Sequence, residues 1–346
     1  MQYSRLGNSG LVVSRLCFGA MTFRDESTTN AHLAKVRGAD ADVLIGRAIE
    51  AGINFFDTAD VYSSGDSEVM LGAALKSRRN DVVIATKCGL RSGPALTQSG
   101  LSRRHINWSV DQSLKRLGTD WIDTYIVHRQ DPLTPLEETL QALDDLVRAG
   151  KVRYLGFSNW SAWKVSAALE LQKANGWSRF THGQMSYSLL TRDIEYDVIP
   201  MMQEYGIGLT IWSPLASGLL SGKYTRDNLN DPANRLGAQQ RLPMDIERGL
   251  SVTDKLRPIA QRHNKSVAQI ALAWVLANPT VTSAILGTTK ISQLDDNLGA
   301  VDVKLTAEDL QQLNDATPLA KLYPNWFHEF VADKQLQVAL NMTQSK

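Results

Sequence analysis

Eight short apolar runs recur along the 346-residue chain, and each is followed by a segment with the features of a helix or by an insertion that contains one. The runs are rich in β-branched residues, as in Val82–Thr86 and Ile122–Val127, and this composition favours buried strands. The predicted strands begin near residues 15, 53, 82, 122, 152, 181, 208 and 282. This alternation restricts the chain to two architectures, a closed α/β barrel or an open doubly wound sheet.

The open sheet would normally carry a Gly-x-Gly-x-x-Gly turn after its first strand, and the sequence has none. We therefore predict a (β/α)8 barrel, also called a TIM barrel. No shift in composition marks a domain boundary, so residues 1–346 are expected to form one domain. We expect a β-hairpin over residues 1–13, the barrel over 14–300, and an extra helix and tail over 301–346.

Helix ends can be predicted from their capping residues. The segment Thr134-Pro135-Leu136-Glu137 is typical of a helix start, because the threonine hydroxyl can accept the N3 amide. A capping box is also expected at Ser266. A helix is expected from about residue 252 to 263, broken or started at Pro258.

Composition excludes several classes of function. The net charge of +1 gives no support for nucleic-acid binding. No run of about 18 apolar residues suggests a membrane span, and the N-terminus lacks a signal pattern, so a cytoplasmic location is predicted. Cys17 and Cys88 do not form a disulfide framework, and no Cys/His cluster has zinc spacing, so no metal site is predicted.

Polar or small residues stand at the ends of seven consecutive predicted strands. These residues are Asp57, Lys87, His128, Ser158, Asn159, Gln184, Ser213 and Gly287. In a barrel these ends meet at one mouth, which is where active sites lie. Strands also simply end where polar residues begin. That reading explains less well why an aspartate, a lysine and a histidine occur together, with Tyr62 nearby.

These four side chains suggest a proton donor for a carbonyl group. A free tyrosine has a pKa near ~10, and the ammonium group of Lys87 is expected to lower the pKa of Tyr62. Asp57 could hold Lys87 charged, and His128 could donate to a substrate carbonyl oxygen. This set supplies no hydride, so a redox cofactor is needed.

The sequence resembles the aldo-keto reductase family over roughly residues 1–320. The similarity is carried by Gly52–Tyr62, by Ile84-Ala85-Thr86-Lys87 and by Asp123–His128. Together these segments are highly specific. The resemblance implies that Tyr62 is the acid/base, with the other three residues as its partners.

The resemblance also implies an extended nicotinamide dinucleotide, bound without a Rossmann fingerprint. The residues that it assigns to the cofactor are Ser158, Asn159, Gln184, Trp212, Ser213, Leu215, Gly218, Lys223, Arg235, Gly287, Thr289, Lys290, Gln293, Asp296 and Asn297. Trp212 would stack on the nicotinamide ring or pack in the core. Thr289-Lys290 stands where many relatives have an arginine near the 2′-phosphate, so NADP(H) is expected and NAD(H) remains possible.

The stretch from Gln184 to Arg192 and the segment at residues 218–224 resemble the branch with bacterial reductases and potassium-channel β subunits. The leading hypothesis is an enzyme that reduces small aldehydes or ketones, as a monomer or homo-oligomer. An alternative is a cofactor-sensing subunit with little turnover, and a barrel hydrolase is a weaker third hypothesis. Specificity is expected in the loops at 20–38 and 88–101 and in the tail at 320–346, with Trp326 in an apolar pocket beside Tyr62.

Overall fold

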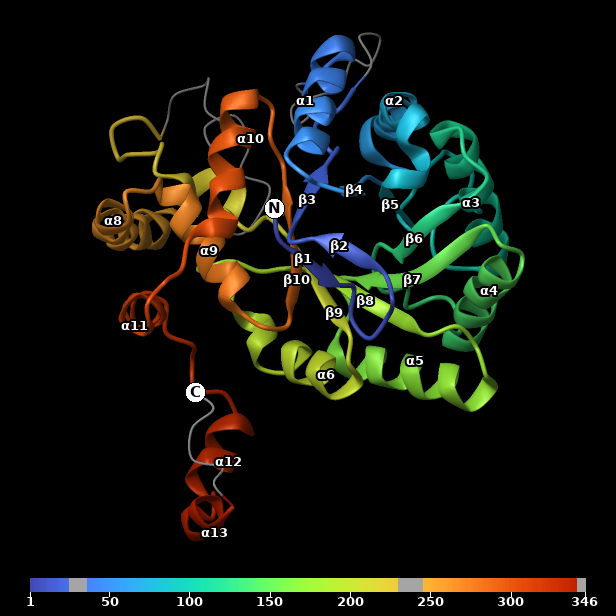
Figure 1. The fold of residues 1–346 in the computed structure, drawn as a ribbon. Helices are drawn as coiled ribbons and strands as arrows, with labels where there is room; N and C mark the ends of the chain where they lie inside the picture. Colours follow the sequence, from blue (N-terminus) through green and yellow to red (C-terminus); the bar gives the residue numbers. More distant parts are fainter. Residues whose placement is uncertain (25–35, 230–244, 341–346) are drawn as a thin grey trace.

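The computed structural model describes residues 1–24, 36–229 and 245–340. Within these residues, eight parallel strands close into a barrel (Figure 1). The strands are β3 (Leu16–Gly19), β4 (Phe55–Asp57), β5 (Val83–Cys88), β6 (Ile122–Val127), β7 (Val152–Ser158), β8 (Phe180–Ser186), β9 (Gly208–Trp212) and β10 (Val281–Leu286). The ring closes where β10 pairs with β3, with Ala284 opposite Leu16. The predicted (β/α)8 barrel is therefore confirmed, and the open sheet is excluded.

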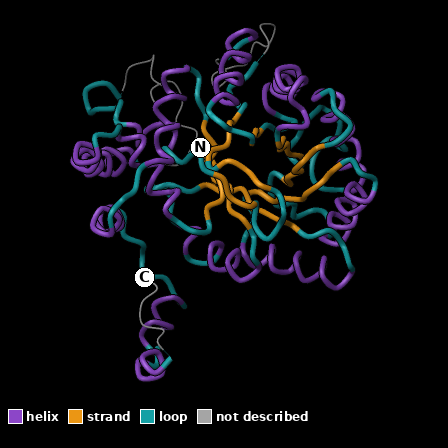
Figure 2. The backbone as a smooth tube through the Cα atoms, viewed as in Figure 1, coloured by secondary structure: helices purple, strands orange, loops and turns teal. Residues whose placement is uncertain are grey.

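Helices surround the strands, which form the central ring in Figure 2. The helices that follow the strands are α1 (Gly38–Glu50), α2 (Asp66–Leu75), α3 (Arg103–Leu117), α4 (Leu136–Arg148), α5 (Ala162–Asn175), α6 (Val198–Tyr205), α8 (Ile246–His263), α9 (Val267–Ala277) and α10 (Ile291–Leu298). α11 (Ala307–Ala316) packs against α8. None of the helices in the described ranges is long and apolar enough to cross a membrane.

The start of α4 differs from the prediction. The Thr134 hydroxyl does not cap the helix, and Pro135 occupies the N-cap position instead. Thr134 Oγ1 donates to Asp131 Oδ2 at 2.7 Å, and the Asp131 carboxylate also accepts the backbone amides of Leu101 and Leu133. Because α4 begins at Leu136, Thr134 lies one residue before the N-cap position, and its hydroxyl serves as a donor to Asp131 instead.

The helix α8, which lies between β9 and β10, also differs from the prediction. α8 begins at Ile246, where the Asp245 side chain accepts the amide of Arg248, and it continues through Pro258 without a break. Proline removes one hydrogen bond from a helix interior. The buried face that includes Leu256 and Ile259 outweighs this loss, because α8 packs against α9 and α11. The predicted capping box at Ser266 is confirmed at the start of α9.

The N-terminal hairpin covers one end of the barrel. β1 (Tyr3–Arg5) and β2 (Val12–Ser14) pair antiparallel, and the hairpin overlies the centre of the ring in Figure 1. Leu6 and Val13 are fully buried and pack with side chains inside the barrel, including Phe55. The hairpin therefore closes the end at which the strands begin, and the other end forms the mouth.

The C-terminal tail contains two short helices, α12 (Asn325–Phe330) and α13 (Lys334–Ala339). Figure 1 shows them set apart from the ring of helices. The base of the tail is held by Tyr196, whose hydroxyl donates to the Ala320 carbonyl at 2.6 Å. Trp326 is 42% exposed and contacts Tyr323 and Phe327 of the tail itself. The expected pocket of Trp326 with Tyr62 is therefore not formed in this structure.

Candidate active site

The four predicted catalytic side chains come from three neighbouring strands of the ring. Asp57 is the last residue of β4, Lys87 lies near the end of β5, and His128 follows β6 directly. Tyr62 begins η1 (Tyr62–Gly65), which follows β4. Because parallel strands all end at the same side of a barrel, these side chains meet at its mouth.

The Lys87 ammonium group is completely buried and hydrogen-bonded. It donates to Asp57 Oδ2 at 2.7 Å, to the Thr58 carbonyl oxygen at 2.6 Å and to Tyr62 Oη at 3.3 Å. An ammonium group has three N–H donors, so each can be assigned to one of these acceptors. Burial alone would lower the pKa of Lys87, but Asp57 and Tyr62 raise this pKa above its usual value. Lys87 is therefore charged at neutral pH.

Asp57 also bonds across the barrel. Its Oδ1 accepts a hydrogen bond from Gln184 Nε2 at 2.7 Å, while its Oδ2 accepts from Lys87. Gln184 lies on β8, which stands opposite β4 in the ring. Both carboxylate oxygens of this buried side chain are therefore satisfied, and the carboxylate is held in one orientation.

The surroundings of Tyr62 shift its pKa in two directions. Burial raises the pKa, and the nearby charge of Lys87 lowers it by a smaller amount, so the pKa of Tyr62 is raised overall. The expectation that Lys87 would lower the pKa below its usual value is therefore wrong for the protein alone. The reason is that desolvation of the phenolate outweighs the ammonium charge. Among the described residues, the Tyr62 hydroxyl has no acceptor for its own proton.

His128 lies edge-on to the Tyr62 ring, with the ring centroids 5.9 Å apart. Burial lowers the pKa of His128 to about 3, and the charge of Lys87 contributes. The imidazole is therefore neutral at physiological pH, and its Nδ1 has no hydrogen-bond partner within the described residues. A neutral imidazole can still donate one hydrogen bond to a bound molecule.

Three of the predicted cofactor residues are linked beside this site. Asn159 Nδ2 donates to the His128 carbonyl oxygen at 3.0 Å and to Ser158 Oγ at 2.9 Å. Trp212 Nε1 donates to Asn159 Oδ1 at 3.2 Å. Asn159 has a positive φ of 58°, which is uncommon outside glycine and is typical of functional loops. The structure thus gathers these side chains on the β7–β9 side of the mouth.

The segment after β9 folds back on itself. Ser213 Oγ accepts the amide of Ser217 at 3.0 Å, and Leu215 is partly buried at the start of η4 (Ala216–Ser221). Gly218 has a φ of 92°. Lys223 is exposed, with its ammonium nitrogen 4.7 Å from the centre of the Tyr224 ring. Arg235 lies outside the described residues.

The remaining predicted residues lie at the end of β10 and on α10. Gly287 is exposed and has open space where a Cβ would stand. Gln293 Oε1 accepts the amide of Thr289 at 3.2 Å, and Lys290 is the exposed N-cap of α10. Asp296 Oδ2 accepts the Ser266 hydroxyl at 2.8 Å, and Asn297 is buried. An exposed ammonium at a helix N-terminus is a suitable contact for a phosphate group.

Sequence reasoning missed two contributions to the site. The Thr58 carbonyl binds Lys87, but a backbone group leaves no sequence signal. Asp60 is 3% exposed and accepts a hydrogen bond from Ser109 Oγ of α3 at 2.9 Å. Its position two residues before Tyr62 was the available signal, but pairing with a helix some 49 residues away was not readable from the sequence.

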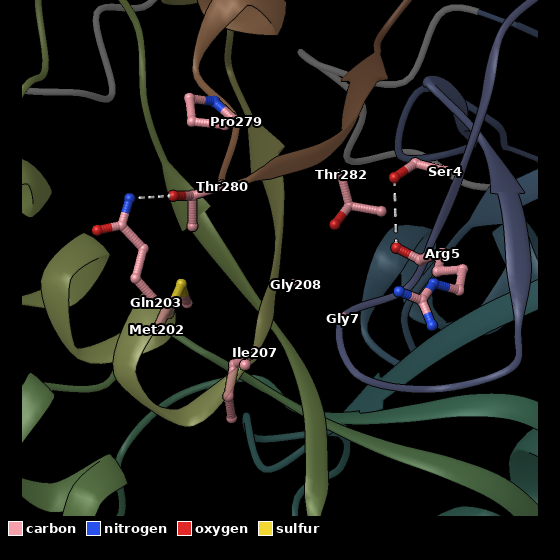
Figure 3. A pocket seen from close by; sticks show the side chains of 11 residues that line it. Ser4, Arg5, Gly7, Met202, Gln203, Ile207, Gly208, Pro279, Thr280 and Thr282 are labelled. Atoms are coloured by element: carbon pink, nitrogen blue, oxygen red, sulfur yellow. Dashed lines mark hydrogen bonds between the residues drawn. The ribbon is translucent and has the colours of Figure 1, made fainter. Parts of the chain in front are cut away.

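A pocket of about 390 Å³ lies at the other end of the barrel, between the hairpin and the starts of β9 and β10 (Figure 3). Two hydrogen bonds join residues of its lining: Gln203 Nε2 donates to Thr280 Oγ1 at 2.8 Å, and the Ser4 hydroxyl donates to the Arg5 carbonyl oxygen. Gly208 is the first residue of β9, so this pocket opens away from the strand ends that carry Tyr62. It is therefore separate from the candidate active site.

A closed parallel barrel with a buried lysine–carboxylate pair beside a phenol defines a (β/α)8 protein with a site at the carboxyl ends of its strands. The sequence profile of the Aldo/keto reductase family matches residues 15–317. The chain belongs to this family, which places it among the oxidoreductases.

Three curated relatives are similar to this chain over most of its length. A probable voltage-gated potassium channel subunit beta from Oryza sativa subsp. japonica is 39% identical over 314 residues, covering 88% of this chain and 92% of the relative. The probable aldo-keto reductase 1 of Glycine max is 37% identical and covers 92% of this chain and 90% of the relative. The versiconal hemiacetal acetate reductase of Aspergillus parasiticus is 34% identical, over 94% of this chain and 99% of the relative.

Proposed function

We propose that the protein reduces aldehydes or ketones to alcohols, reversibly, with NADP(H) as the cofactor and Tyr62 as the proton donor. When bound, the nicotinamide cofactor supplies the hydride. The observation that carries the proposal is the set of acceptors around Lys87. Because Tyr62 Oη accepts one N–H of this ammonium group, the phenolic proton is left to face a molecule in the mouth.

The proposed proton transfer uses groups that are already in place. The O–H bond of Tyr62 breaks as the alkoxide oxygen of the forming alcohol takes the proton. The phenolate that remains is stabilised by the ammonium nitrogen of Lys87, 3.3 Å away. Asp57 keeps Lys87 charged during this step, and a proton from solvent restores the phenol. In the direction of alcohol oxidation, the phenolate takes the proton back.

His128 is proposed to orient the carbonyl group. Its neutral imidazole lies edge-on to Tyr62 and can donate one hydrogen bond to the carbonyl oxygen. Because the pKa of His128 is about 3, this donor does not change its charge across the range in which enzymes are usually assayed. We therefore expect that the titration of His128 causes no change of the reaction rate with pH near neutrality.

The cofactor is proposed to lie across the β7–β10 side of the mouth. Ser158, Asn159 and the partly exposed Trp212 ring surround the expected place of the nicotinamide. Gln184 uses its amide nitrogen on Asp57, which leaves its amide oxygen for the carboxamide group. Lys290, at the N-terminus of α10, supports a preference for the 2′-phosphate of NADP(H).

The test is the consumption of NADPH with a panel of aldehydes and ketones, for the wild type and Tyr62→Phe. The variant keeps the ring but loses the proton, so its kcat should fall by about 10²–10⁴-fold. Its affinity for NADPH, followed by quenching of tryptophan fluorescence, should stay within about twofold of the wild type, since the ring remains. Comparable turnover in the two proteins would remove Tyr62 as the acid.

The name of the Oryza sativa relative favours a second candidate function, in which the chain senses the cofactor as an auxiliary subunit of a channel-like assembly. Both candidates require cofactor binding, but only the first requires turnover. Tight NADPH binding with negligible reduction of every carbonyl compound, together with co-purification of a membrane channel, would support the second candidate.

A further inference from the structure

The loop that carries Tyr62 lies against α3 at both of its ends. Before Tyr62, Ser109 Oγ of α3 donates to Asp60 Oδ2 at 2.9 Å. After Tyr62, Gly65 lies so close to the Arg116 side chain that an added Cβ would be 2.7 Å from Arg116 Cδ. Residues seven apart lie on the same face of a helix, so one face of α3 contacts both ends of the loop.

Between these two contacts the loop adopts an uncommon conformation. Ser63 and Ser64 have φ values of 47° and 57°, and Gly65 has a φ of 103°. Non-glycine residues adopt this region at a cost, so the surrounding contacts must hold the loop in place. One of these contacts is the Ser63 hydroxyl, which donates to the Phe23 carbonyl oxygen at 2.6 Å. The position of Tyr62 therefore depends on contacts outside the loop.

Asp60 is the buried acid at the start of this loop. It is 3% exposed, and its backbone amide donates to the Lys87 carbonyl oxygen at 3.3 Å. Its Oδ2 bonds to Ser109, while its Oδ1 is buried and has no partner among the described residues. A half-satisfied carboxylate is costly to bury, which a purely structural role for this side chain does not explain.

Titratable or charged groups on several neighbouring elements interact electrostatically with Asp60. They are Glu68 on α2, Arg116 on α3, Lys87 and Cys88 on β5, Tyr125 on β6, and Tyr62 on η1. Glu68 is paired with Arg116, at 2.6 Å, and also accepts the Thr86 hydroxyl. The Asp60 carboxylate therefore interacts electrostatically with Tyr62, the proposed acid.

We propose that Asp60 is a positioning residue for Tyr62, which holds the Tyr62 loop on α3 through Ser109 and acts on the phenol through its own charge. The proposal rests on the function proposed for Tyr62 above. The hydrogen bond to Ser109 fixes the place of the phenol, and the ionisation state of the carboxyl group tunes how easily the phenol releases its proton.

The direction of the charge effect can be derived. Burial raises the pKa of Asp60 to about 7, so the carboxyl group ionises in the physiological range. The Asp60 carboxylate raises the pKa of Tyr62, because a nearby negative charge disfavours the phenolate. Above neutral pH, ionised Asp60 therefore keeps Tyr62 protonated to higher pH. This favours carbonyl reduction and delays the onset of alcohol oxidation.

The charge is tested with Asp60→Asn, which keeps an oxygen acceptor for Ser109 but carries no charge. The alkaline limb of kcat for reduction should move to lower pH by about 0.5–1 pH unit, less than the shift that a charge in direct contact produces. Alcohol oxidation should begin at a correspondingly lower pH. The matched control is Asp144→Asn, which removes another carboxylate that is 3% exposed, far along the chain on α4. This control should leave both limbs unchanged.

The hydrogen bond between Ser109 and Asp60 is tested with Ser109→Ala and Ser109→Thr. Loss of the hydroxyl should lower kcat about tenfold, the effect of removing one hydrogen bond to a charged group, while the Kd for NADPH stays within about twofold. Ser109→Thr retains a hydroxyl and should restore most of kcat. A loss that appears equally in kcat and in NADPH affinity, or a threonine variant no better than alanine, would overturn the anchoring role.

A readout without turnover separates this proposal from the proposed function. NMR of protein labelled with ¹³C at tyrosine Cζ follows the titration of Tyr62, with Tyr62→Phe to assign its signal. Asp60→Asn should move this titration to lower pH whether or not any carbonyl compound is reduced. An unchanged titration in Asp60→Asn would overturn the charge effect. Absence of turnover in the wild type would overturn the proposed function instead.

Discussion

Gln184 Nε2 donates a 2.7 Å hydrogen bond to Asp57 Oδ1, and so joins two residues 127 positions apart across the interior of the barrel. The acceptor is the carboxylate that holds Lys87. The lysine beside the phenol is therefore held by its neighbouring strand and, through Asp57, by the opposite side of the ring. This arrangement makes the buried charges interdependent.

Lys87→Met should destabilise the protein by about 3–5 kcal/mol, because it leaves the Asp57 carboxylate buried without a counter-charge. The double variant Lys87→Met/Asp57→Asn removes both charges and should be more stable than Lys87→Met alone. Urea unfolding of the single and double variants measures the free energies. If the destabilisation of the double variant equals the sum of those of Lys87→Met and Asp57→Asn, the two charges are not coupled.

Lys290→Met should raise the KM for NADPH by up to about tenfold, since it removes a charged contact to the 2′-phosphate. The KM for NADH should not change. Lys304→Met is the control, because it removes another exposed ammonium group, which lies after α10 and was assigned no cofactor contact. Equal changes for the two cofactors would exclude this role of Lys290.

Asp309→Asn should lower stability at pH 7 by about 1–3 kcal/mol, with the difference shrinking as the pH falls below about 4. Burial alone would raise the pKa of Asp309, but hydrogen bonds from Thr306, His263 and Arg262 lower it overall. A lowered pKa means that this stability is present above the unfolded value of ~3.9 and is lost as the pH falls through the folded value.

Urea unfolding at a series of pH values measures the effect of Asp309→Asn. Glu308→Gln removes a neighbouring exposed carboxylate and should stay within about 0.5 kcal/mol of the wild type. A difference between Asp309→Asn and the wild type that persists unchanged down to pH 2 would contradict the assigned cause.

Gly156→Ala and Gly46→Ala make the same chemical change with opposite expected results. A Cβ at Gly156 would lie 2.5 Å from Cε1 of the buried His182, so the substitution should destabilise by about 1–3 kcal/mol. Gly46, inside α1, has open space there, and alanine should stabilise the helix by about 0.5–1 kcal/mol. Thermal unfolding of the two variants compares them directly, and a stable Gly156→Ala would mean that His182 can move.

The strands and the mouth could be predicted because each depends on neighbouring residues. Buried apolar runs end at Asp57, Lys87 and His128, and barrel closure then brings those ends together without further information. The bond between Gln184 and Asp57 could not be predicted in this way. It depends on which side chains face each other across the ring, and this is set by the register of strands far apart in the sequence.

Two errors have a common physical cause, in that the tertiary environment of Pro258 and of Tyr62 outweighed a local signal. Thr134 has the right identity for a helix cap, but α4 begins at Leu136, so Pro135 occupies the N-cap position and the Thr134 hydroxyl donates to Asp131. Pro258 disfavours a helix, but burial of one helix face outweighed it. The pKa of Tyr62 was expected to fall because a charge is adjacent, yet burial had the larger effect.

Leu6 and Val13 of the N-terminal hairpin fill the far end of the barrel, and this limits the route by which reactants enter and leave. Any molecule that reaches Tyr62 through the barrel must enter and leave through its mouth. A cofactor and a carbonyl compound that share this mouth would obstruct each other, so the one that binds deeper must bind first and dissociate last. Steady-state product-inhibition patterns should then show a compulsory order of binding and release. The closure of the far end by Leu6 and Val13 would be the origin of that order.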